Sequence, residues 1–494
     1  MRLGSLLKDG SCGNANVEIA GIAYDSRAVR QGYAFFAIAG TALDGRKFIP
    51  DAIAKGAVAV VTEEGGGAPL AVPDGIALAI VPDARRALSR ASDVFYKEPS
   101  KSLTVVGVTG TKGKTTTCHM VKAVMDACGE KTGLIGTIHN IVGNEERPVT
   151  RTTPESADLH ALMGEMLTVG STAVTMEVSS HALVLKRAED IRFSAGVLTN
   201  IGRDHLDFHG TVEKYAEAKR HLFEMLGKGG VAVLNLDEPF YPLFREACRV
   251  PTVTYGLSAG AEVTAEDLRM DGSGSSFTLR LGRGREAVRL RLPGRFNVYN
   301  ALAAASAAYG LGKDSGQIAA GLSAAERVRG RVEVVEGPGD FTVWVDYAHT
   351  PESLQGILSL AREVSRGRVI AVFGCGGDRD TGKRPVMGRI AADLADHVVI
   401  TDDNPRTEDQ DHILNQIEEG IGQSSRHPGF TRLKDRREAI HRAVDLAGPD
   451  DIVVVAGKGH ETYQQFKEAT VDFDDVLVAR EAMNRRAGIE GEGQ

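Results

Sequence analysis

The sequence predicts an α/β protein of three domains, which we place at residues 1–98, 99–330 and 331–494. The 494 residues are too many for one ordinary core, since about 150 residues per domain is common. Within Ser102–Cys128 an apolar strand, a glycine-rich loop and a helix follow one another. In the last third of the chain, four apolar runs each lead into a polar loop. These patterns predict a central parallel sheet of the P-loop type and a C-terminal, doubly wound sheet.

The composition is that of a globular enzyme, with 42% hydrophobic and 25% charged residues. The net charge of −8 argues against a nucleic-acid binder, because neutralising phosphates needs a basic footprint. No run of 18 apolar residues and no secretory signal are found, so we expect no membrane span and a cytoplasmic location. The cysteines are scattered without a CxxC pair and are expected to be reduced thiols: Cys12, Cys118, Cys128, Cys248 and Cys375.

The strongest single motif is the strand Leu103–Val108 followed by the loop Gly110–Thr115, which we call the phosphate loop. Backbone N–H groups at a helix start attract phosphate, Lys114 adds a full positive charge, and the hydroxyl of Thr115 can bind Mg²⁺. The strict motif has glycine where Val108 stands, so the loop is a variant. The alternative is a glycine-rich turn with an accidental Lys-Thr pair. The next helix has one buried face: Val121, Val124, Met125 and Cys128.

The first block has the pattern of a small α/β unit. Its predicted strands are Tyr33–Ala39, Ala57–Val61 and Ile76–Val81. Gly65–Pro69 is predicted to be a loop, and Tyr96–Pro99 a linker into the second block.

In the second block, polar residues follow two predicted strands. Glu177 lies at the end of one strand, and His205 follows the next. Parallel sheets place ligands at the carboxyl ends of their strands, so both residues could converge on the phosphate loop. A predicted helix, Thr211–Leu226, carries Lys219. The strands of this block are Ser171–Val178, Ala195–Thr199 and Val231–Leu236.

The end of the second block is less regular. Alternating polar and apolar residues over 251–292 predict a small antiparallel addition. The segment 294–300 opens an alanine-rich helix, Ala301–Gly310.

Each candidate also has a structural interpretation. His205 could be a loop histidine, and Lys219 a solvated surface lysine. The remaining candidates could be helix caps or turn residues: Asn297, Asn300, Asp346 and His349.

The third block repeats the pattern of a strand followed by a polar loop four times. Four such ends in one domain indicate a binding edge. Arg406 could bind a carboxylate in a bidentate manner, although Asn-Pro also favours a turn, and Glu461 could hold an ammonium group. The predicted strands are Thr342–Val345, Val369–Phe373, Val398–Thr401 and Ile452–Ala456, and the loops are Asp346–Pro351, Gly374–Asp380, Asp402–Arg406 and Gly457–Glu461.

These motifs together resemble the bacterial Mur ligase family, over nearly the whole chain. Within it they are similar to the members that add the third residue of the peptidoglycan stem peptide. The matching segments are Asp25–Val29, Thr109–Thr117, Arg151–Glu155, Met176–Leu183, Thr199–Gly210, Glu217–Phe223, Gly294–Asn300, Val345–Leu354, Gly374–Asp380, Asp402–Asp409 and Gly457–Glu461. One departure is Leu185, where related enzymes would be expected to carry glutamine.

The resemblance implies three domains that bind a uridine nucleotide, ATP and an amino acid in turn, the central one ATPase-like and the C-terminal one Rossmann-like. It assigns Gly110, Thr111, Lys112, Gly113, Lys114, Thr115, Thr116, Asn300, Arg331, Asp346 and His349 to the nucleotide. It assigns Ser26 to the UDP-sugar, and Thr152, Thr153, Ser179 and Arg187 to the muramoyl-dipeptide. The amino acid would meet Arg379, Asp403, Asn404, Pro405, Arg406, Gly457 and Glu461.

The resemblance also implies a metal site and three catalytic residues. Lys114, His205 and Lys219 would be catalytic, and Thr115, Glu177, His205 and Lys219 would bind Mg²⁺. Lys219 matches a lysine that the family carries in carbamylated form. Addition of CO₂ to the unprotonated amine would make it a carboxylate-like ligand of a second Mg²⁺.

The implied reaction is ATP-dependent formation of an amide. The D-Glu γ-carboxylate of UDP-N-acetylmuramoyl-L-Ala-D-Glu would attack ATP, and the amine of meso-2,6-diaminopimelate would displace phosphate from the acyl phosphate. In the resemblance, Arg406 marks the enzymes that use diaminopimelate. Lysine would leave Arg406 unpaired, which can cost about 10⁴-fold in specificity. We expect a monomer.

Two other function classes are compatible with parts of the pattern. A folylpolyglutamate synthetase would not need the Asp25–Val29 segment or the loop that contains Arg406. A P-loop switch or motor protein would hydrolyse ATP without a UDP-sugar. A pseudo-enzyme is disfavoured by the presence of the candidate catalytic and metal-binding residues, which are Lys114, Thr115, Glu177, His205 and Lys219.

Overall fold

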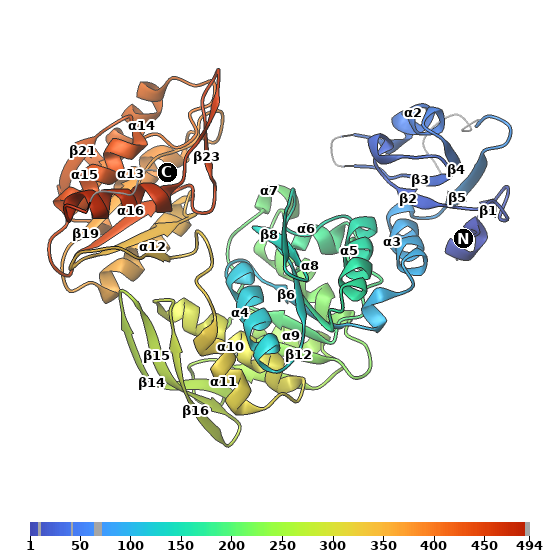
Figure 1. Cartoon of the computed structure of the whole chain (residues 1–494), viewed down its shortest axis with the longest axis horizontal. Helices are drawn as coiled ribbons and strands as arrows, with labels where there is room; N and C mark the ends of the chain where they lie inside the picture. The colour runs from blue at the N-terminus through green and yellow to red at the C-terminus, as the bar shows by residue number, and fades with distance from the viewer. Residues whose placement is uncertain (8–10, 41–42, 64–71, 490–494) are drawn as a thin grey trace. The chain divides into compact units, whose positions relative to one another are not determined.

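The computed structural model describes residues 1–7, 11–40, 43–63 and 72–489 (Figure 1). The chain forms two compact units. The first comprises residues 1–265, 279–286 and 299–322, and the second comprises 266–278, 287–298 and 323–494. This division does not test the expected domain limits at residues 98 and 330, which stay predictions. In the described part of the chain, no helix is long and apolar enough to cross a membrane.

The first sheet has the order β1-β5-β4-β3-β2, and β1 alone pairs antiparallel. Phe35 and Phe36 point to opposite faces and are both fully buried, so the sheet is covered on both sides. The predicted loop Gly65–Pro69 lies outside the described residues. The elements are α1 Leu3–Leu6, β1 Ser11–Cys12, β2 Gly21–Ala23, β3 Tyr33–Ala37, α2 Ile49–Ala54, β4 Ala57–Glu63, β5 Ala77–Val81 and α3 Ala84–Phe95, with 3-10 turns at Ser26–Ala28, Gly45–Phe48 and Pro99–Lys101.

In the second sheet, β6 lies between β10 on one side and β11 on the other. These strands are parallel, so their carboxyl ends lie at one edge. The predicted face of α4 is buried at Val121, Val124 and Met125, whereas Cys128 follows the end of the helix and is partly exposed. The elements are β6 Thr104–Thr109, α4 Lys114–Ala127, β7 Thr132–Ile135, β8 His139–Val142, β9 Glu145–Pro148, α5 Ser156–Thr168, β10 Ala173–Glu177, α6 Ser180–Val184, β11 Ala195–Leu198, α7 Leu206–His209, α8 Val212–Glu224, β12 Val231–Asn235, α9 Tyr241–Ala247 and β13 Thr252–Tyr255.

The predicted antiparallel addition extends this sheet as β14 Val263–Asp271, β15 Gly274–Leu281 and β16 Gly284–Leu290. Only two residues separate successive strands, which is the length of a hairpin connection. The following helix, α10, spans Arg295–Gly310, so the predicted start at Ala301 was too late. The positive φ of Gly294 (99°) turns the chain directly into the helix. Helix α11, Ser315–Ala324, follows.

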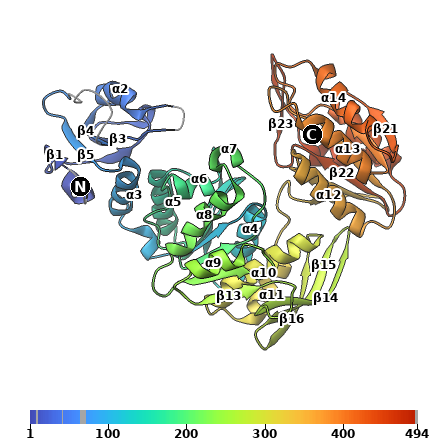
Figure 2. The same ribbon diagram turned by 180° about the vertical axis from the view of Figure 1, so that it is seen from behind.

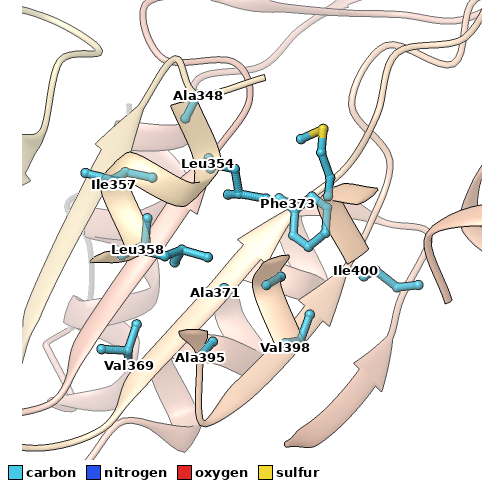
Figure 3. Packing of buried hydrophobic residues seen from close by; sticks show 14 of the residues in the cluster. Ala348, Leu354, Ile357, Leu358, Val369, Ala371, Phe373, Ala395, Val398 and Ile400 are labelled. Atoms are coloured by element: carbon cyan, nitrogen blue, oxygen red, sulfur yellow. The ribbon is translucent and has the colours of Figure 1, made fainter. Parts of the chain in front are cut away.

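The third sheet has the order β17-β18-β22-β19-β20-β21, parallel except for β17, and Figure 2 shows it from behind. Alternate residues of β19 enter different cores. Val369, Ala371 and Phe373 pack toward α12 to α14 (Figure 3), whereas Ile370 and Val372 pack toward α15 and α16. The predicted doubly wound sheet is therefore confirmed.

Four strands of the third sheet end at one edge, as predicted, because β18, β22, β19 and β20 are parallel. The elements are β17 Glu333–Val335, β18 Thr342–Asp346, α12 Pro351–Val364, β19 Val369–Phe373, α13 Lys383–Leu394, β20 His397–Ile400, α14 Gln410–Gly422, β21 Gly429–Arg432, α15 Arg436–Leu446, β22 Ile452–Ala456, β23 Tyr463–Gln465, β24 Thr470–Asp472 and α16 Asp475–Arg486.

Candidate active site

The glycine loop connects β6 to α4 and is held closely by the segment that follows β11. A Cβ at Gly110, where φ is 146°, would lie 1.9 Å from Oγ1 of Thr199. The backbone N–H of Lys112 donates to Oδ1 of Asn200 at 3.0 Å. A Cβ at Gly113 would lie 2.3 Å from Oδ1 of Asn300. Both glycines are therefore required by space as well as by backbone conformation.

Lys114 folds back over the loop that it follows. Its Nζ donates to the carbonyl oxygens of Gly110 and Thr111, each at 2.9 Å. The hydroxyl-bearing residues Thr115 and Thr116 lie in the first turn of α4 and are largely buried. The loop thus presents a cation, a helix N-terminus and a hydroxyl at one place, which is the chemistry that binds a phosphate chain with its Mg²⁺.

Lys219 lies on α8 and is only 1% exposed. Its Nζ donates to the carbonyl of Gly110 at 2.8 Å and lies 4.5 Å from the centre of the Tyr215 ring. Burial, reinforced by the positive charge of Lys114, lowers the pKa of Lys219 well below its ordinary value, whereas Asp204 acts in the opposite direction. The solvated surface lysine considered from the sequence is therefore ruled out, because Lys219 is buried and hydrogen-bonded to the loop.

Glu177 is the last residue of β10, and His205 follows β11; these two strands are the neighbours of β6. The Oε1 of Glu177 accepts from the backbone N–H and the hydroxyl of Thr137, at 2.8 and 2.9 Å. His205 has a left-handed φ of 52°, its side chain is about half exposed, and its ring meets the edge of the His181 ring at 4.7 Å.

Within the described residues, no group of three or more His, Cys, Asp or Glu side chains is arranged to hold a metal. The predicted metal set contains only Glu177 and His205 of these types, beside the Thr115 hydroxyl and a lysine that would be modified.

The residues expected around the muramoyl-dipeptide gather beyond β10. The hydroxyl of Thr153 donates to the Glu177 carbonyl at 2.8 Å and lies 3.2 Å from the hydroxyl of Ser179. Arg187 donates to the carbonyl of Thr153 at 3.2 Å and forms an ion pair with the buried Glu155 at 3.3 Å. The hydroxyl of Thr152 accepts from Thr137 at 3.1 Å. The structure thus brings these four predicted residues together.

Ser26 lies in a 3-10 turn of the N-terminal sheet and is only 5% exposed. Hydrogen bonds from Ser26 and then Lys55 lower the pKa of the Asp51 carboxyl. Asp25 caps the turn by accepting from the backbone N–H of Arg27 at 2.9 Å.

Two of the residues expected at the amino acid are joined at the edge of the third sheet. Nδ2 of Asn404 donates to Oε2 of Glu461 at 3.0 Å. Oδ1 of Asn404 accepts from Nζ of Lys458 at 3.0 Å and from the backbone N–H of Gln465 at 2.9 Å. Lys458 also lies 3.6 Å from Oδ1 of Asp403 and 3.3 Å from Glu461. We call these four residues, Asp403, Asn404, Lys458 and Glu461, the Asn404–Glu461 network.

Arg406 lies beside this network, with a left-handed φ of 53°. Its Nη1 donates to the carbonyl of Gly377 at 2.8 Å. A Cβ at Gly377 would lie 1.9 Å from the carbonyl oxygen of Pro405, so this loop and the Pro405–Arg406 turn are in direct contact. Arg379 is exposed, and Gly457 has a φ of 122°.

Two buried arginines support these loops from beneath. Arg384 forms a bidentate pair with Glu408, both bonds 2.7 Å long, and donates to the Gly376 carbonyl at 3.2 Å. Arg436 forms a fully buried bidentate pair with Asp475, at 2.8 and 2.7 Å. Fork-to-fork pairs of this kind fix geometry as well as charge.

Asp402 is a buried carboxyl at the start of the loop that contains Asn404. Within the described structure, its Oδ1 has no hydrogen-bond partner. Burial raises the pKa of Asp402 to about 7.

Three residues expected at the nucleotide lie around Tyr347 in the second compact unit. The Arg331 guanidinium lies 5.3 Å from the centre of the Tyr347 ring, and the His349 ring lies 4.6 Å from it. Asp346 accepts from the backbone N–H of Val332 at 2.8 Å. Asn300 belongs to the first unit together with the phosphate loop. The nucleotide set is therefore divided between the two units.

Sequence reasoning did not single out Lys458, Thr137, Glu155 or Arg384. Lys458 and Glu155 belong to matched motifs, so their position in a motif was an available signal. Thr137 and Arg384 act through contacts to residues 40 and 24 positions away, which no local pattern reveals.

Three family models match the chain. They are the catalytic domain of the Mur ligase family over residues 18–96, the Mur ligase middle domain over 108–308, and the glutamate ligase domain of Mur ligases over 330–459.

Curated relatives match over nearly the whole length. The UDP-N-acetylmuramoyl-L-alanyl-D-glutamate–2,6-diaminopimelate ligase of Halalkalibacterium halodurans is 44% identical over 474 residues, 95% of this chain and 96% of the relative. The ligase of the same name from Geobacillus kaustophilus is 43% identical over 477 residues, with coverage of 95% and 96%.

Solved structures also match the chain over nearly its whole length. A structure of a ligase of the same name has a TM-score of 0.74 and 32% identity, and covers 99% of both chains. A MurF structure from Acinetobacter baumannii, at 20% identity and a TM-score of 0.66, shares the fold.

Proposed function

Because the chain belongs to the Mur ligase family of ATP-dependent ligases, we propose that it joins meso-2,6-diaminopimelate to UDP-N-acetylmuramoyl-L-alanyl-D-glutamate in peptidoglycan precursor synthesis. The observation that carries this proposal is the 44% identity to a ligase of that name over 95% of the chain. The phosphate loop and the Asn404–Glu461 network support it, because they supply the chemistry that the two halves of the reaction need.

In the proposed reaction, the substrate γ-carboxylate attacks the γ-phosphate of ATP. ADP leaves, and an acyl phosphate remains. The amine of diaminopimelate then adds to the acyl carbon, loses a proton, and displaces inorganic phosphate. Lys114 exchanges its two loop carbonyls for phosphate oxygens and reduces the repulsion between two anions.

The residues expected at the metal have suitable donor chemistry. Thr115 offers a hydroxyl and Glu177 a carboxylate, which are the hard oxygen ligands that Mg²⁺ prefers, and His205 adds a ring nitrogen. When bound, Mg²⁺ would supply charge neutralisation for the phosphates.

For Lys219 we propose carbamylation, which would make it a ligand of a second Mg²⁺. Its burial and lowered pKa support this, because only the neutral amine adds CO₂. A carbamate carbon signal from ¹³C-bicarbonate should appear in the wild-type NMR spectrum and be absent from Lys219→Arg. An identical spectrum from both proteins would refute the modification.

The other site residues are assigned by substrate. Asn300, Arg331, Asp346 and His349 would contact the nucleotide. Ser26 would contact the UDP-sugar, and the gathered set Thr152, Thr153, Ser179 and Arg187 the dipeptide. Leu185 has an aliphatic side chain, which offers no hydrogen bond to the peptide.

For the amino acid, we propose that Arg406 binds the distal carboxylate of diaminopimelate. The Gly457 carbonyl and Glu461 would hold the distal ammonium. Arg379, Asp403, Asn404 and Pro405 would shape the rest. Lysine has the ammonium but no distal carboxylate, so it would leave the Arg406 guanidinium unpaired.

The test is phosphate release from the purified protein with the UDP-dipeptide, ATP and a panel of amino acids. We expect meso-diaminopimelate to give the highest rate and L-lysine a far lower one. Faster release with L-lysine would overturn the choice of amino acid. ATP hydrolysis without the UDP-dipeptide would favour a P-loop switch protein instead.

We further propose that the enzyme acts as a monomer in the cytoplasm. A single mass matching 52.6 kDa in light scattering, and recovery in the cytosolic fraction, would agree with this. A dimer mass or recovery with membranes would contradict it.

A further inference from the structure

Lys458 is a fully buried lysine for which the proposed reaction has so far supplied no role. It follows β22 by two residues, and its side chain is 0% exposed. Burying an ammonium is costly unless it is paired and hydrogen-bonded, so its partners define its role.

The partners of Lys458 are the groups expected to receive the amino acid. Its Nζ donates to Oδ1 of Asn404 at 3.0 Å and to Oε2 of Glu461 at 3.3 Å, and it lies 3.6 Å from Oδ1 of Asp403. The ring of Tyr463 lies 5.4 Å away. Lys458 is thus shared between two carboxylates and one amide.

The bonds of Asn404 orient both neighbours. Its Oδ1 receives two donors, and its Nδ2 donates to the carboxylate oxygen of Glu461 that also meets Lys458. Removing the ammonium would leave Oδ1 with one donor, and it would leave Oε2 of Glu461 with only the Asn404 amide of these two donors.

We propose that Lys458 is the positioning residue that sets amino-acid specificity, by balancing the charge of this site. The inference rests on the proposed function. Asp403 and Glu461 contribute −2, and Lys458 and Arg406 contribute +2, so these four groups sum to zero. A neutral site suits the distal end of diaminopimelate, where an ammonium and a carboxylate also sum to zero.

Without Lys458, the remaining three groups sum to −1. Such a site attracts a lone ammonium more strongly and repels a second carboxylate, so it moves toward a diamino acid with no distal carboxylate. The effect is on discrimination, because ATP and the UDP-dipeptide do not meet these groups in the proposed assignment.

The experiment compares Lys458→Met with Lys467→Met, which removes an exposed lysine between β23 and β24. For each enzyme, kcat/KM is measured with meso-diaminopimelate and with L-lysine. We expect the ratio of these values to fall about 10- to 100-fold in Lys458→Met and to stay unchanged in the control. KM for ATP and for the UDP-dipeptide should change less than about twofold. A loss of packing alone would lower both kcat/KM values equally, and that result would overturn the proposal.

A second variant shifts the charge the other way. Asp403→Asn keeps Lys458 and makes the sum +1, so the ratio should rise as lysine is excluded further. An unchanged or lower ratio would overturn the proposal even if Lys458→Met does not fold. If the wild-type enzyme ignores diaminopimelate, the proposed function fails; if it uses diaminopimelate and the ratios do not move, only the present inference fails.

Discussion

Arg406 holds an unusual backbone conformation for a long side chain. A non-glycine residue at a φ of 53° costs on the order of 1 kcal/mol, and such residues concentrate at binding sites. Its Nη1 donates to the carbonyl of Gly377 at 2.8 Å and to that of Asn404 at 3.5 Å, so most donors of the guanidinium are left for other partners. These features agree with the proposed bond to a distal carboxylate.

Replacing Arg406 with alanine should therefore raise KM for meso-diaminopimelate about 100-fold or more, because the distal carboxylate would lose a charged partner worth ~3 kcal/mol. KM for the UDP-dipeptide should not change. Steady-state kinetics on Arg406→Ala and on Arg437→Ala, an exposed arginine paired with Glu481, would separate a local effect from a general one. An unchanged KM for diaminopimelate would count against the carboxylate contact.

We expect the stability of the folded protein to depend on pH through the carboxyl group of Asp402. Burial raises its folded-state pKa to about 7 from 3.8, so between these values the unfolded chain releases the proton and the folded chain keeps it. Stability from this group is therefore complete at low pH and is lost as pH rises from about 4 to 7.

Asp402→Asn should raise Tm relative to wild type at pH 8, by an amount equivalent to ~2 kcal/mol, and much less at pH 4. Calorimetry at both pH values tests this, with Asp340→Asn at an exposed position as the control. An equal change in Tm at both pH values would show that ionisation of Asp402 is not the cause.

At the scale of elements, the phosphate loop is held in place by a segment that is far from it in sequence. Thr199 and Asn200 follow β11, yet they bond to Lys112 at 2.7 to 3.0 Å. The parallel pairing of β6 with β11 brings these segments together. Arg384 and Glu408 connect the loops of the third sheet in the same way.

Gly110 and Gly129 both have a positive φ, so alanine variants of these two glycines can be compared. Gly110→Ala should weaken ATP binding at least tenfold, because its Cβ would clash with Thr199 at 1.9 Å. Gly129→Ala has no atom within 4 Å of the new Cβ and should cost about 1 kcal/mol of stability without affecting ATP. Binding of ATP and thermal unfolding of both variants would be measured. Equal losses of ATP affinity would show that backbone strain, not the clash, decides.

At the scale of the whole molecule, the phosphate loop and the Asn404–Glu461 network belong to different compact units. In the proposed reaction, the acyl phosphate forms before the amine adds, so the first step does not need the amino acid.

With ATP and the UDP-dipeptide but no amino acid, we therefore expect about one ADP per enzyme and no further turnover. Adding meso-diaminopimelate should start continuous release of ADP and phosphate. A rapid-quench measurement of ADP formation tests this expectation. Steady ATP hydrolysis without the amino acid would contradict the proposed order of steps.

The sequence by itself determined the α/β class, the phosphate loop and the polar strand ends, because these depend on local patterns such as periodicity and glycine spacing. It also determined which residues the family resemblance assigns, of which Thr152, Thr153, Ser179 and Arg187 are adjacent in the structure. The predicted start of α10 was too late, which shows that a local sequence pattern did not fix the first residue of this helix.

Only the tertiary structure showed that Lys219 and Lys458 are buried, and which groups they contact. Lys219 meets Gly110 across 109 residues, and Lys458 meets Asn404 across 54. Whether a lysine is solvated or buried among partners depends on which distant strands pair, since desolvation is a property of the assembled fold. For the same reason, the charge balance around Arg406 could be counted only after β20 and β22 had brought their loops to one edge.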